Sequence, residues 1–269
     1  MTRQVIFSAD DFGLTESVNE AVERAHREGI LTHASLMVGA PAAADAVRRA
    51  RSMPGLKVGL HLVVIEGPAV LPPSAIPDLV DAEGQFPSDQ LRMGIDYFFR
   101  PRVRRQLAAE IRAQFQAFAD TGLMLDHANA HKHMHLHPTV GAMMLRIGCE
   151  LGLRSIRIPA EPPRTMLRLG VPQSLGASLL YAWTELLRSQ ARKAGVETNN
   201  HCFGLAWSGH MTADRVRALI DQLPKKGLSE IYFHPATERD AVLRRLMPDY
   251  EHEAEFAALL DRGISQALR

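Results

Sequence analysis

The chain has 269 residues, of which 46% are hydrophobic and 23% charged, as in a globular protein with a sizeable core. Its net charge of +1 gives no case for a nucleic-acid partner. The only cysteines, Cys149 and Cys202, exclude a CxxC metal site and fit a reducing compartment. Acidic residues come too early for a signal peptide, and no run approaches the roughly 20 apolar residues of a membrane span. We therefore expect a cytoplasmic protein.

Strands and helices alternate in the first sixty residues. Apolar, β-branched runs predict strands at 4–8, 34–38 and 57–62. Between them, a capping-box spacing from Ser17 and a stop at Gly29 predict one helix, and residues 42–51 predict another. This alternation is typical of a parallel sheet.

The rest of the chain continues this rhythm after a long loop rich in proline and glycine at residues 66–90. We expect helices at 101–121, 138–151, 212–223 and 250–261, and strands at 123–130, 155–158, 200–203 and 230–233. No linker or repeat divides the sequence. The pattern predicts an α/β protein with a single domain over residues 1–269, folded as a distorted (β/α) barrel of about seven βα units.

Residues 162–195 form an apolar, partly helical segment. Leu175, Leu179, Trp183 and Leu186 lie along one stripe at helical spacing. Core packing is the common role of such a stripe. An apolar insertion that serves as a lid, a partner surface or a membrane-facing patch is the alternative.

A histidine tract follows the strand predicted at 123–130. His131, His133, His135 and His137 occupy every second position, and imidazole is both a common metal ligand and a proton carrier. In an extended backbone the first three would share one face. One metal ion cannot take all of them together with other ligands and stay open to substrate, so we assign one ligand to the tract.

Four predicted strands end in residues suited to catalysis: Asp10 with Asp11, His61, His131 and His234. Active-site groups of βα barrels come from the carboxyl ends of strands. A lone histidine is more often structural, and the Asp-Asp pair alone could be a helix cap, but their coincidence favours a shared site. One carboxylate and two imidazoles leave positions open on Zn²⁺ or another divalent ion, while the second carboxylate faces substrate.

The sequence resembles the YdjC/ChbG-like carbohydrate deacetylases over nearly its whole length. The resemblance rests on Ala-Asp-Asp-Phe-Gly at 9–13, Gly-Leu-His at 59–61, the tract at 131–135 and Phe-His-Pro-Ala at 233–236. Segments 59–67, 129–138 and 157–162 most resemble the hopanoid-biosynthesis-associated members of that family. Residues 129–133 read Asn-Ala-His-Lys-His, where chitooligosaccharide-specific members tend to have Asp-Ser-His-His-His.

The resemblance implies a distorted barrel that removes acetyl groups from N-acetylated sugars with one divalent metal ion, Zn or Mg. Asp11, His61 and His131 would be the metal ligands, Asp10 the general base and His234 the acid that protonates the leaving amine. The implied substrate is an N-acetylglucosaminyl hopanoid, which would give the glucosaminyl hopanoid and acetate.

Three further residues are candidates for substrate binding or for supporting the ligands: His133, His135 and Arg157. Arg157 could bind substrate, orient Asp10 or form a surface salt bridge. The expected partner is an N-acetylated glycolipid or oligosaccharide, with peripheral contact at the inner membrane and a homodimer as further expectations.

The rival readings are a deacetylase of soluble chitooligosaccharides, an Fe(II) oxygenase with two histidines and one carboxylate, and a non-catalytic metal-containing protein that binds sugar or lipid. Oxygen-independent turnover would exclude the oxygenase.

Overall fold

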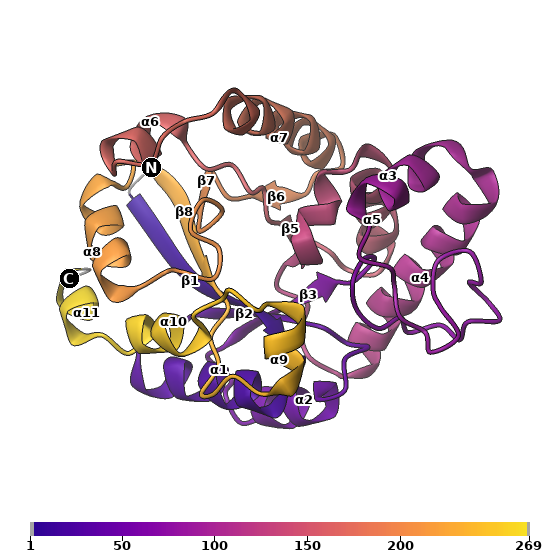
Figure 1. Cartoon of the computed structure of the whole chain (residues 1–269), viewed down its shortest axis with the longest axis horizontal. Coiled ribbons are helices and arrows are strands. Elements are labelled where there is room, and N and C mark those ends of the chain that lie inside the picture. Colours follow the sequence, from indigo (N-terminus) through magenta and orange to yellow (C-terminus); the bar gives the residue numbers. More distant parts are fainter. Residues whose placement is uncertain (1–2, 268–269) are drawn as a thin grey trace.

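The computed structural model describes residues 3–267, which form one curled sheet of eight parallel strands surrounded by helices (Figure 1). The strand order is β6-β5-β4-β3-β2-β1-β8-β7. The strands are β1 (Arg3–Phe12), β2 (His33–Leu36), β3 (Lys57–Leu62), β4 (Ala128–Ala130), β5 (Ser155–Ile156), β6 (Glu197–Thr198), β7 (His201–Phe203) and β8 (Gly227–Phe233). The expected α/β distorted barrel is confirmed, with eight strands in place of about seven.

The two edge strands of this sheet, β6 and β7, are separated in the chain only by Asn199 and Asn200. The Asn199 side chain accepts a hydrogen bond from the Ile158 amide (2.6 Å) and donates to the Ile158 carbonyl (2.8 Å). Next to it, the Cys202 amide donates to the Ala160 carbonyl (3.0 Å). The Asn199 side chain thus makes hydrogen bonds like those of a backbone amide between the segment after β5 and the turn that joins β6 to β7. The two-residue strands β5 and β6 provide few backbone hydrogen bonds there.

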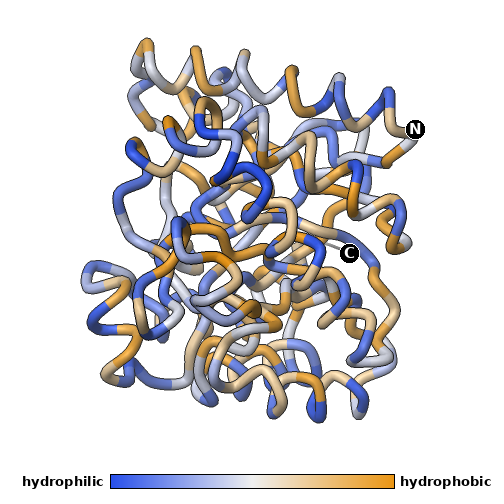
Figure 2. The backbone as a smooth tube through the Cα atoms, turned by 90° about the vertical axis from the view of Figure 1, so that its right-hand side faces the viewer, coloured by the Kyte–Doolittle hydropathy of each residue, from blue (hydrophilic) through white to orange (hydrophobic). Residues whose placement is uncertain are grey.

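The helices connect and cover the strands. They are α1 (Glu16–Glu28), α2 (Ala43–Arg51), α3 (Gln90–Phe99), α4 (Pro101–Asp120), α5 (Pro138–Glu150), α6 (Pro163–Arg168), α7 (Leu175–Lys193), α8 (Ala213–Gln222), α9 (Ala241–Leu246), α10 (His252–Leu259) and α11 (Arg262–Ala267). Along the outer helices hydrophobic and hydrophilic residues alternate (Figure 2), because each helix turns one apolar face toward the sheet. Within residues 3–267 no helix is long and apolar enough to cross a membrane.

Three sequence-based expectations differ from this architecture. Residues 123–127 precede β4 and lie outside the assigned strand, although the Asp126 amide donates to the Val58 carbonyl of β3 (3.0 Å), and α3 occupies a region where no helix was expected. Helix α1 begins at Glu16 with Thr15 as its cap, whose hydroxyl accepts from the Val18 amide (3.4 Å). The expected loop at 66–90 is present as far as α3, and the buried carboxylate of Glu110 holds it by accepting from the amides of Val70 (2.8 Å) and Leu71 (2.9 Å).

Candidate metal centre and catalytic site

Two neighbouring carboxylates, those of Asp10 and Asp11, are buried at the carboxyl end of β1. In a regular strand adjacent side chains point to opposite faces. Here the register with β2 shifts between Ala9 and Phe12, and Asp11 has a φ of 61°, in the left-handed region. Such a conformation is costly for a residue other than glycine and tends to occur at functional sites. It lets these two side chains make separate sets of contacts at the same end of the barrel.

The Asp11 carboxylate lies between two imidazoles. Its Oδ1 is 3.2 Å from His61 Nε2, at the end of β3, and 3.3 Å from His131 Nδ1, directly after β4. One ligand atom from each of the three residues lies within 4.8 Å of the others. Both Asp11 oxygens and His61 Nε2 are buried without a hydrogen-bond partner. Because buried polar atoms are rarely left unpaired, this geometry fits a shared divalent cation.

Asn129 determines which nitrogen of His61 faces Asp11. Its Oδ1 lies 2.7 Å from His61 Nδ1, and since an amide oxygen only accepts, Nδ1 carries the proton. The lone pair of Nε2 is then free on the side of Asp11, as a metal ligand requires. The Asn129 amide nitrogen donates to Asp10 Oδ1 (3.0 Å) and to the Ser35 hydroxyl (3.0 Å).

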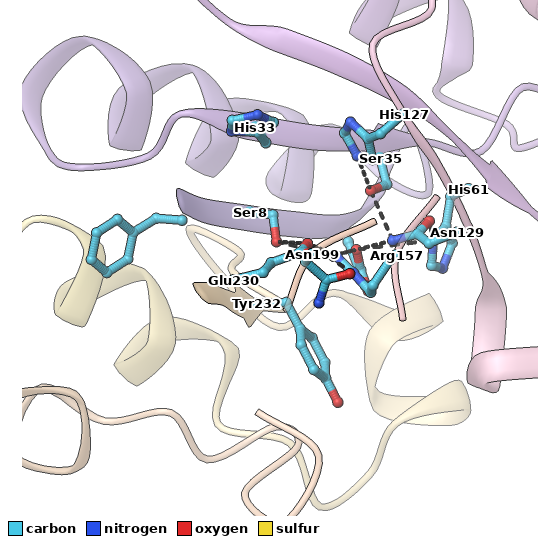
Figure 3. A network of polar contacts seen from close by, with 12 residues as sticks. Ser8, His33, Ser35, His61, His127, Asn129, Arg157, Asn199, Glu230 and Tyr232 are labelled. Carbon is cyan, nitrogen blue, oxygen red and sulfur yellow. Dashed lines mark hydrogen bonds and ion pairs between the residues drawn. The ribbon is translucent and has the colours of Figure 1, made fainter. Parts of the chain in front are cut away.

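The buried side chain of Arg157 lies next to Ser8 and Glu230 (Figure 3), and it also holds Asp10. It donates to Asp10 Oδ2 (2.5 Å) and Oδ1 (2.9 Å), to Glu230 Oε1 (2.8 Å) and to the Ser8 hydroxyl (3.0 Å). The guanidinium also covers the ring of Tyr232, 4.8 Å from its centroid. The surface salt bridge considered for Arg157 is therefore wrong, and the contact with Asp10 is present.

The charge of Arg157 controls the ionisation of Asp10. Burial raises the pKa of Asp10, but the positive charge of Arg157 and its hydrogen bonds lower it more, so the pKa lies well below the usual range of an aspartate. Burial likewise raises the pKa of Asp11, and the adjacent imidazoles of His131 and His61 lower it well below that range. Both groups are therefore carboxylates at neutral pH.

The histidine tract is a 3-10 turn, η1 (His131–Leu136), and the expected extended backbone is wrong. Lys132 and His133 have φ values of 49° and 54°, so successive side chains turn away from one another instead of alternating between two faces. Only His131 joins the cluster with Asp11. The assignment of a single ligand to the tract agrees with this geometry.

His133 and His135 contact the residues around Arg157. His133 Nε2 is 3.1 Å from the Tyr232 hydroxyl, and His135 Nε2 is 3.1 Å from the Arg157 carbonyl. Burial and the charge of Arg157 lower the pKa of His133 to about 3, and burial together with His133 lowers the pKa of His135 well below its usual value. Both rings are neutral at neutral pH, so they support the site as hydrogen-bonding groups.

His234 follows β8 and lies between two tyrosine rings, with centroids 5.7 Å (Tyr232) and 5.1 Å (Tyr250) away. Its backbone amide donates to the buried carboxylate of Glu255, whose Oε2 is 3.9 Å from His234 Nδ1. Burial lowers the pKa of His234 to about 4, against the negative charges of Asp11 and Asp10. The ring is therefore neutral in the structure as it stands.

Four residues that position this site have no role in the sequence-based prediction: Asn129, Glu230, Tyr232 and Glu255. Asn129 stands out in the sequence only as a departure from the chitooligosaccharide-specific members of the family. Glu230 is a charged residue inside a predicted core strand, where it needs a partner, and this partner, Arg157, is 73 residues away. Tyr232 and Glu255 give no signal by type or spacing.

An apolar groove of about 750 Å³ lies between α3, η1 and α7, beside the part of the histidine tract that follows His131. Its walls include Ile95, Phe98, Leu180 and Trp183, and His133 lines it where it meets the tract. The Trp183 indole donates to the Leu136 carbonyl (2.9 Å) and so fixes α7 against η1. The site therefore combines a polar centre with a large apolar neighbour.

The fold and the cluster define a class of protein: a parallel α/β barrel with carboxylates and imidazoles gathered at the carboxyl ends of its strands. Residues 4–269 match the family model for YdjC-like proteins. The chain belongs to the YdjC-like family, and that part of the sequence-based resemblance is confirmed.

Several relatives match this chain over most of its length. A carbohydrate deacetylase of Brevibacillus brevis is 31% identical over 243 residues, which cover 89% of this chain and 84% of the relative. A carbohydrate deacetylase of Geobacillus stearothermophilus is 30% identical, covering 88% and 80%. A crystal structure from Enterococcus faecalis, provisionally named for cellobiose-phosphate cleavage, superposes with a TM-score of 0.77 at 23% identity, covering 100% of this chain and 94% of that one. This structural likeness confirms the fold.

Proposed function

We propose that this chain is a metal-dependent carbohydrate N-deacetylase, which hydrolyses the acetamide of an N-acetylated sugar to an amine and acetate. The observation that carries the proposal is the set of buried, unpartnered ligand atoms of Asp11 and His61 beside His131. The second carboxylate belongs to Asp10, the residue before Asp11, and hydrogen bonds from Arg157 fix its orientation. The naming of the bacterial relatives as carbohydrate deacetylases supports the same reaction.

Asp11, His61 and His131 would hold one divalent ion, Zn or Mg. One carboxylate oxygen and two imidazole nitrogens are a donor set that Zn²⁺ accepts readily and that leaves positions open. When bound, the ion would acidify a water molecule and polarise the acetamide carbonyl. The proton on His61 Nδ1, held by Asn129, keeps the ligand nitrogen deprotonated.

Asp10 would take the proton of the attacking water. Its contacts with Arg157 keep it ionised, as a base must be, although its low pKa makes it a weak base toward ordinary water. The contacts with Arg157 and Asn129 also fix the direction of the carboxylate. Asp10 would therefore act only on a water molecule whose pKa the neighbouring ion has lowered.

His234 would protonate the leaving nitrogen. The ring is neutral at rest, so it must take up a proton when substrate binds, and the negative charges of Asp11 and Asp10 favour that uptake. The proton that Asp10 removes from water replaces the one that His234 gives to the amine. The cycle then consumes only water and the acetamide.

The proposed substrate is an N-acetylglucosaminyl hopanoid, converted to the glucosaminyl hopanoid and acetate at the cytoplasmic side of the inner membrane. Two observations support an apolar aglycone: the groove next to His133, and the resemblance of segments 59–67, 129–138 and 157–162 to hopanoid-associated family members. A soluble chitooligosaccharide would leave the apolar walls of this groove without a role. It is the rival substrate.

The test is an acetate-release assay on the full chain, stripped of metal and then reconstituted with Zn²⁺ or Mg²⁺. We expect release from the N-acetylglucosaminyl lipid only in the reconstituted protein, under anaerobic conditions as well as in air. Release from chitobiose in preference to the lipid would support the soluble-sugar rival. No release from any N-acetylated sugar with any metal would reject the deacetylase.

The substitution Asp10→Asn separates catalysis from metal binding. We expect acetate release to fall by about 10²–10⁴-fold, the usual contribution of a general base, while the metal content per chain stays unchanged. The matched control is Asp126→Asn, because Asp126 precedes β4 and so lies at the amino-terminal end of the barrel, away from the site. This variant should retain activity. If Asp10→Asn also loses its metal, the proposed division of labour between Asp10 and Asp11 is wrong.

A further inference from the structure

No side chain in the first half of α7 is buried. From residue 174 to residue 183 this holds although the segment contains Leu175, Leu179 and Trp183. The buried residues of α7, Thr184, Leu187 and Ala191, all belong to its second half. The four residues of the predicted apolar stripe, Leu175, Leu179, Trp183 and Leu186, are all exposed, so core packing does not explain the stripe. Large apolar side chains gathered on a surface mark a contact with something other than water.

The exposed side chains continue on both sides of α7. Figure 1 shows α6, α7 and α3 one after another along the upper side of the molecule. We call the exposed apolar residues on these helices the apolar face. It comprises Leu91, Ile95, Phe98, Phe99, Leu167, Leu175, Leu179, Leu180, Trp183 and Leu186, whose exposed fractions run from 36% for Leu180 to 78% for Leu175. Leu91, Phe99 and Trp183 also line the groove, so the groove opens onto this face.

Arginines flank the apolar face at its two ends. Residues 162–184 contain no acidic residue, and Arg164 and Arg168 on α6 are exposed. At the other end residues 97–109 contain no acidic residue, and Arg104 and Arg105 are exposed. Within the described part of the chain none of these four arginines makes an ion pair within 4.0 Å of a carboxylate, although Arg100 and Arg102 nearby do (partners Asp96 and Asp78).

We propose that the apolar face docks onto an anionic lipid bilayer, with its leucines and aromatic rings at the acyl boundary and the flanking arginines on the headgroups. Amphipathic helices with cationic flanks bind membrane surfaces in this way. A second copy of the chain fits less well, because a two-fold contact through this face brings like-charged flanks together. The docking deepens the proposed function, since it places the groove against the bilayer that holds a glycolipid substrate.

The experiment is co-sedimentation of the full chain with vesicles of phosphatidylcholine alone or with 30% phosphatidylglycerol. We expect binding to the anionic vesicles, weakened by salt, and at least tenfold weaker binding for the double variant Leu175→Asp/Leu179→Asp. The matched control is Met124→Asp, because Met124 is equally exposed (74%) but precedes β4 at the amino-terminal end of the barrel. Arg164→Gln and Arg168→Gln should each weaken anionic binding by about fivefold.

Four results would overturn the docking: no binding of the unmodified chain, full binding by the double variant, equal loss in Met124→Asp, or a solution dimer that the double variant dissociates. Acetate release from a soluble N-acetylated sugar monitors the active site of every variant, and circular dichroism monitors its fold. Vesicle binding needs no catalysis. A chain that binds vesicles but releases no acetate would therefore reject the proposed deacetylase and leave the docking in place.

Discussion

At the scale of single residues, Asn129 contacts both a proposed metal ligand, His61, and the proposed general base, Asp10. One amide accepts from the ligand His61 and donates both to the proposed base Asp10 and to Ser35. These three contacts use both the amide donor group and the carbonyl acceptor of the side chain, whereas a carboxylate at this position could only accept. The resemblance to the family identifies position 129 as a departure from its chitooligosaccharide-specific members, and the structure shows what the asparagine does.

We predict that Asn129→Ala lowers metal affinity by about 10–100-fold, the usual effect of removing a residue that orients a metal-binding histidine. The His61 ring loses the acceptor that fixes its proton on Nδ1, and Asp10 loses one donor. Competition titration with a chelating dye measures the affinity. Ser35→Ala removes only the third contact and should change it little. Unaltered affinity in Asn129→Ala, or an equal fall in Ser35→Ala, would contradict this role.

At the scale of elements, helix α3 determines the groove but escaped prediction from the sequence. Apolar residues occupy positions 91, 93, 95, 97, 98 and 99, so the segment shows no clean helical stripe. Only Met93 and Tyr97, four residues apart, face the core, and the Tyr97 hydroxyl donates to the Val64 carbonyl (2.5 Å). The other apolar residues face the groove or solvent, and periodicity cannot distinguish a wall of a groove from a core.

We predict that Trp183→Ala raises KM for a lipid-linked N-acetylglucosamine by about tenfold, because a large apolar wall of the groove and its bond to Leu136 are lost. KM for a short soluble N-acetylated glycoside should stay the same. Leu186 is an exposed apolar residue three positions after Trp183 on the same helix and outside the groove lining, so Leu186→Ala serves as the control. Equal effects on both substrates would mean that the groove does not hold the aglycone.

At the scale of the whole molecule, the barrel interior holds histidines that burial keeps neutral. Burial and the neighbouring His127 lower the pKa of His33 to about 4, and burial lowers those of His133 and His234 to about 3 and about 4. An unfolded histidine binds its proton near pH 6.5. The unfolded chain therefore takes up more protons than the folded chain as pH falls from about 6.5 to about 4, and the free energy of unfolding falls over that window.

The substitution His33→Gln isolates one such contribution. Removing a group with a lowered pKa should make the loss of stability between about pH 6.5 and pH 4 less steep, as measured by the denaturant midpoint of metal-free protein at each pH. His210→Gln, on a ring 3.5 Å from the exposed Glu251 carboxylate and outside the barrel, is the control. A His33→Gln profile parallel to that of the unmodified chain would show that His33 does not contribute to this pH dependence.

The sequence by itself determined most of the elements and the candidate group of residues. Alternating strands and helices are typical of a parallel sheet, and parallel strands bring their carboxyl ends to one edge, so Asp10, Asp11, His61, His131 and His234 could be grouped before any coordinates. The family resemblance then selected Asp11, His61 and His131 as the metal ligands, and these three lie together in the structure. The carboxylate and imidazole side chains of this group limited which reactions it can carry out. These features are local, or follow from the connectivity of parallel strands, and can therefore be predicted from the sequence.

Only the tertiary structure decided how those residues are held. Arg157 pairs with Asp10 across 147 positions, and two consecutive left-handed residues in η1 separate His131 from the rest of its tract. The predicted apolar stripe of α7 is exposed, because the helix turns Thr184, Leu187 and Ala191 toward the core instead. Burial, long-range pairing and backbone conformation depend on what surrounds a residue in space, and the order of residues along the chain does not contain that information directly.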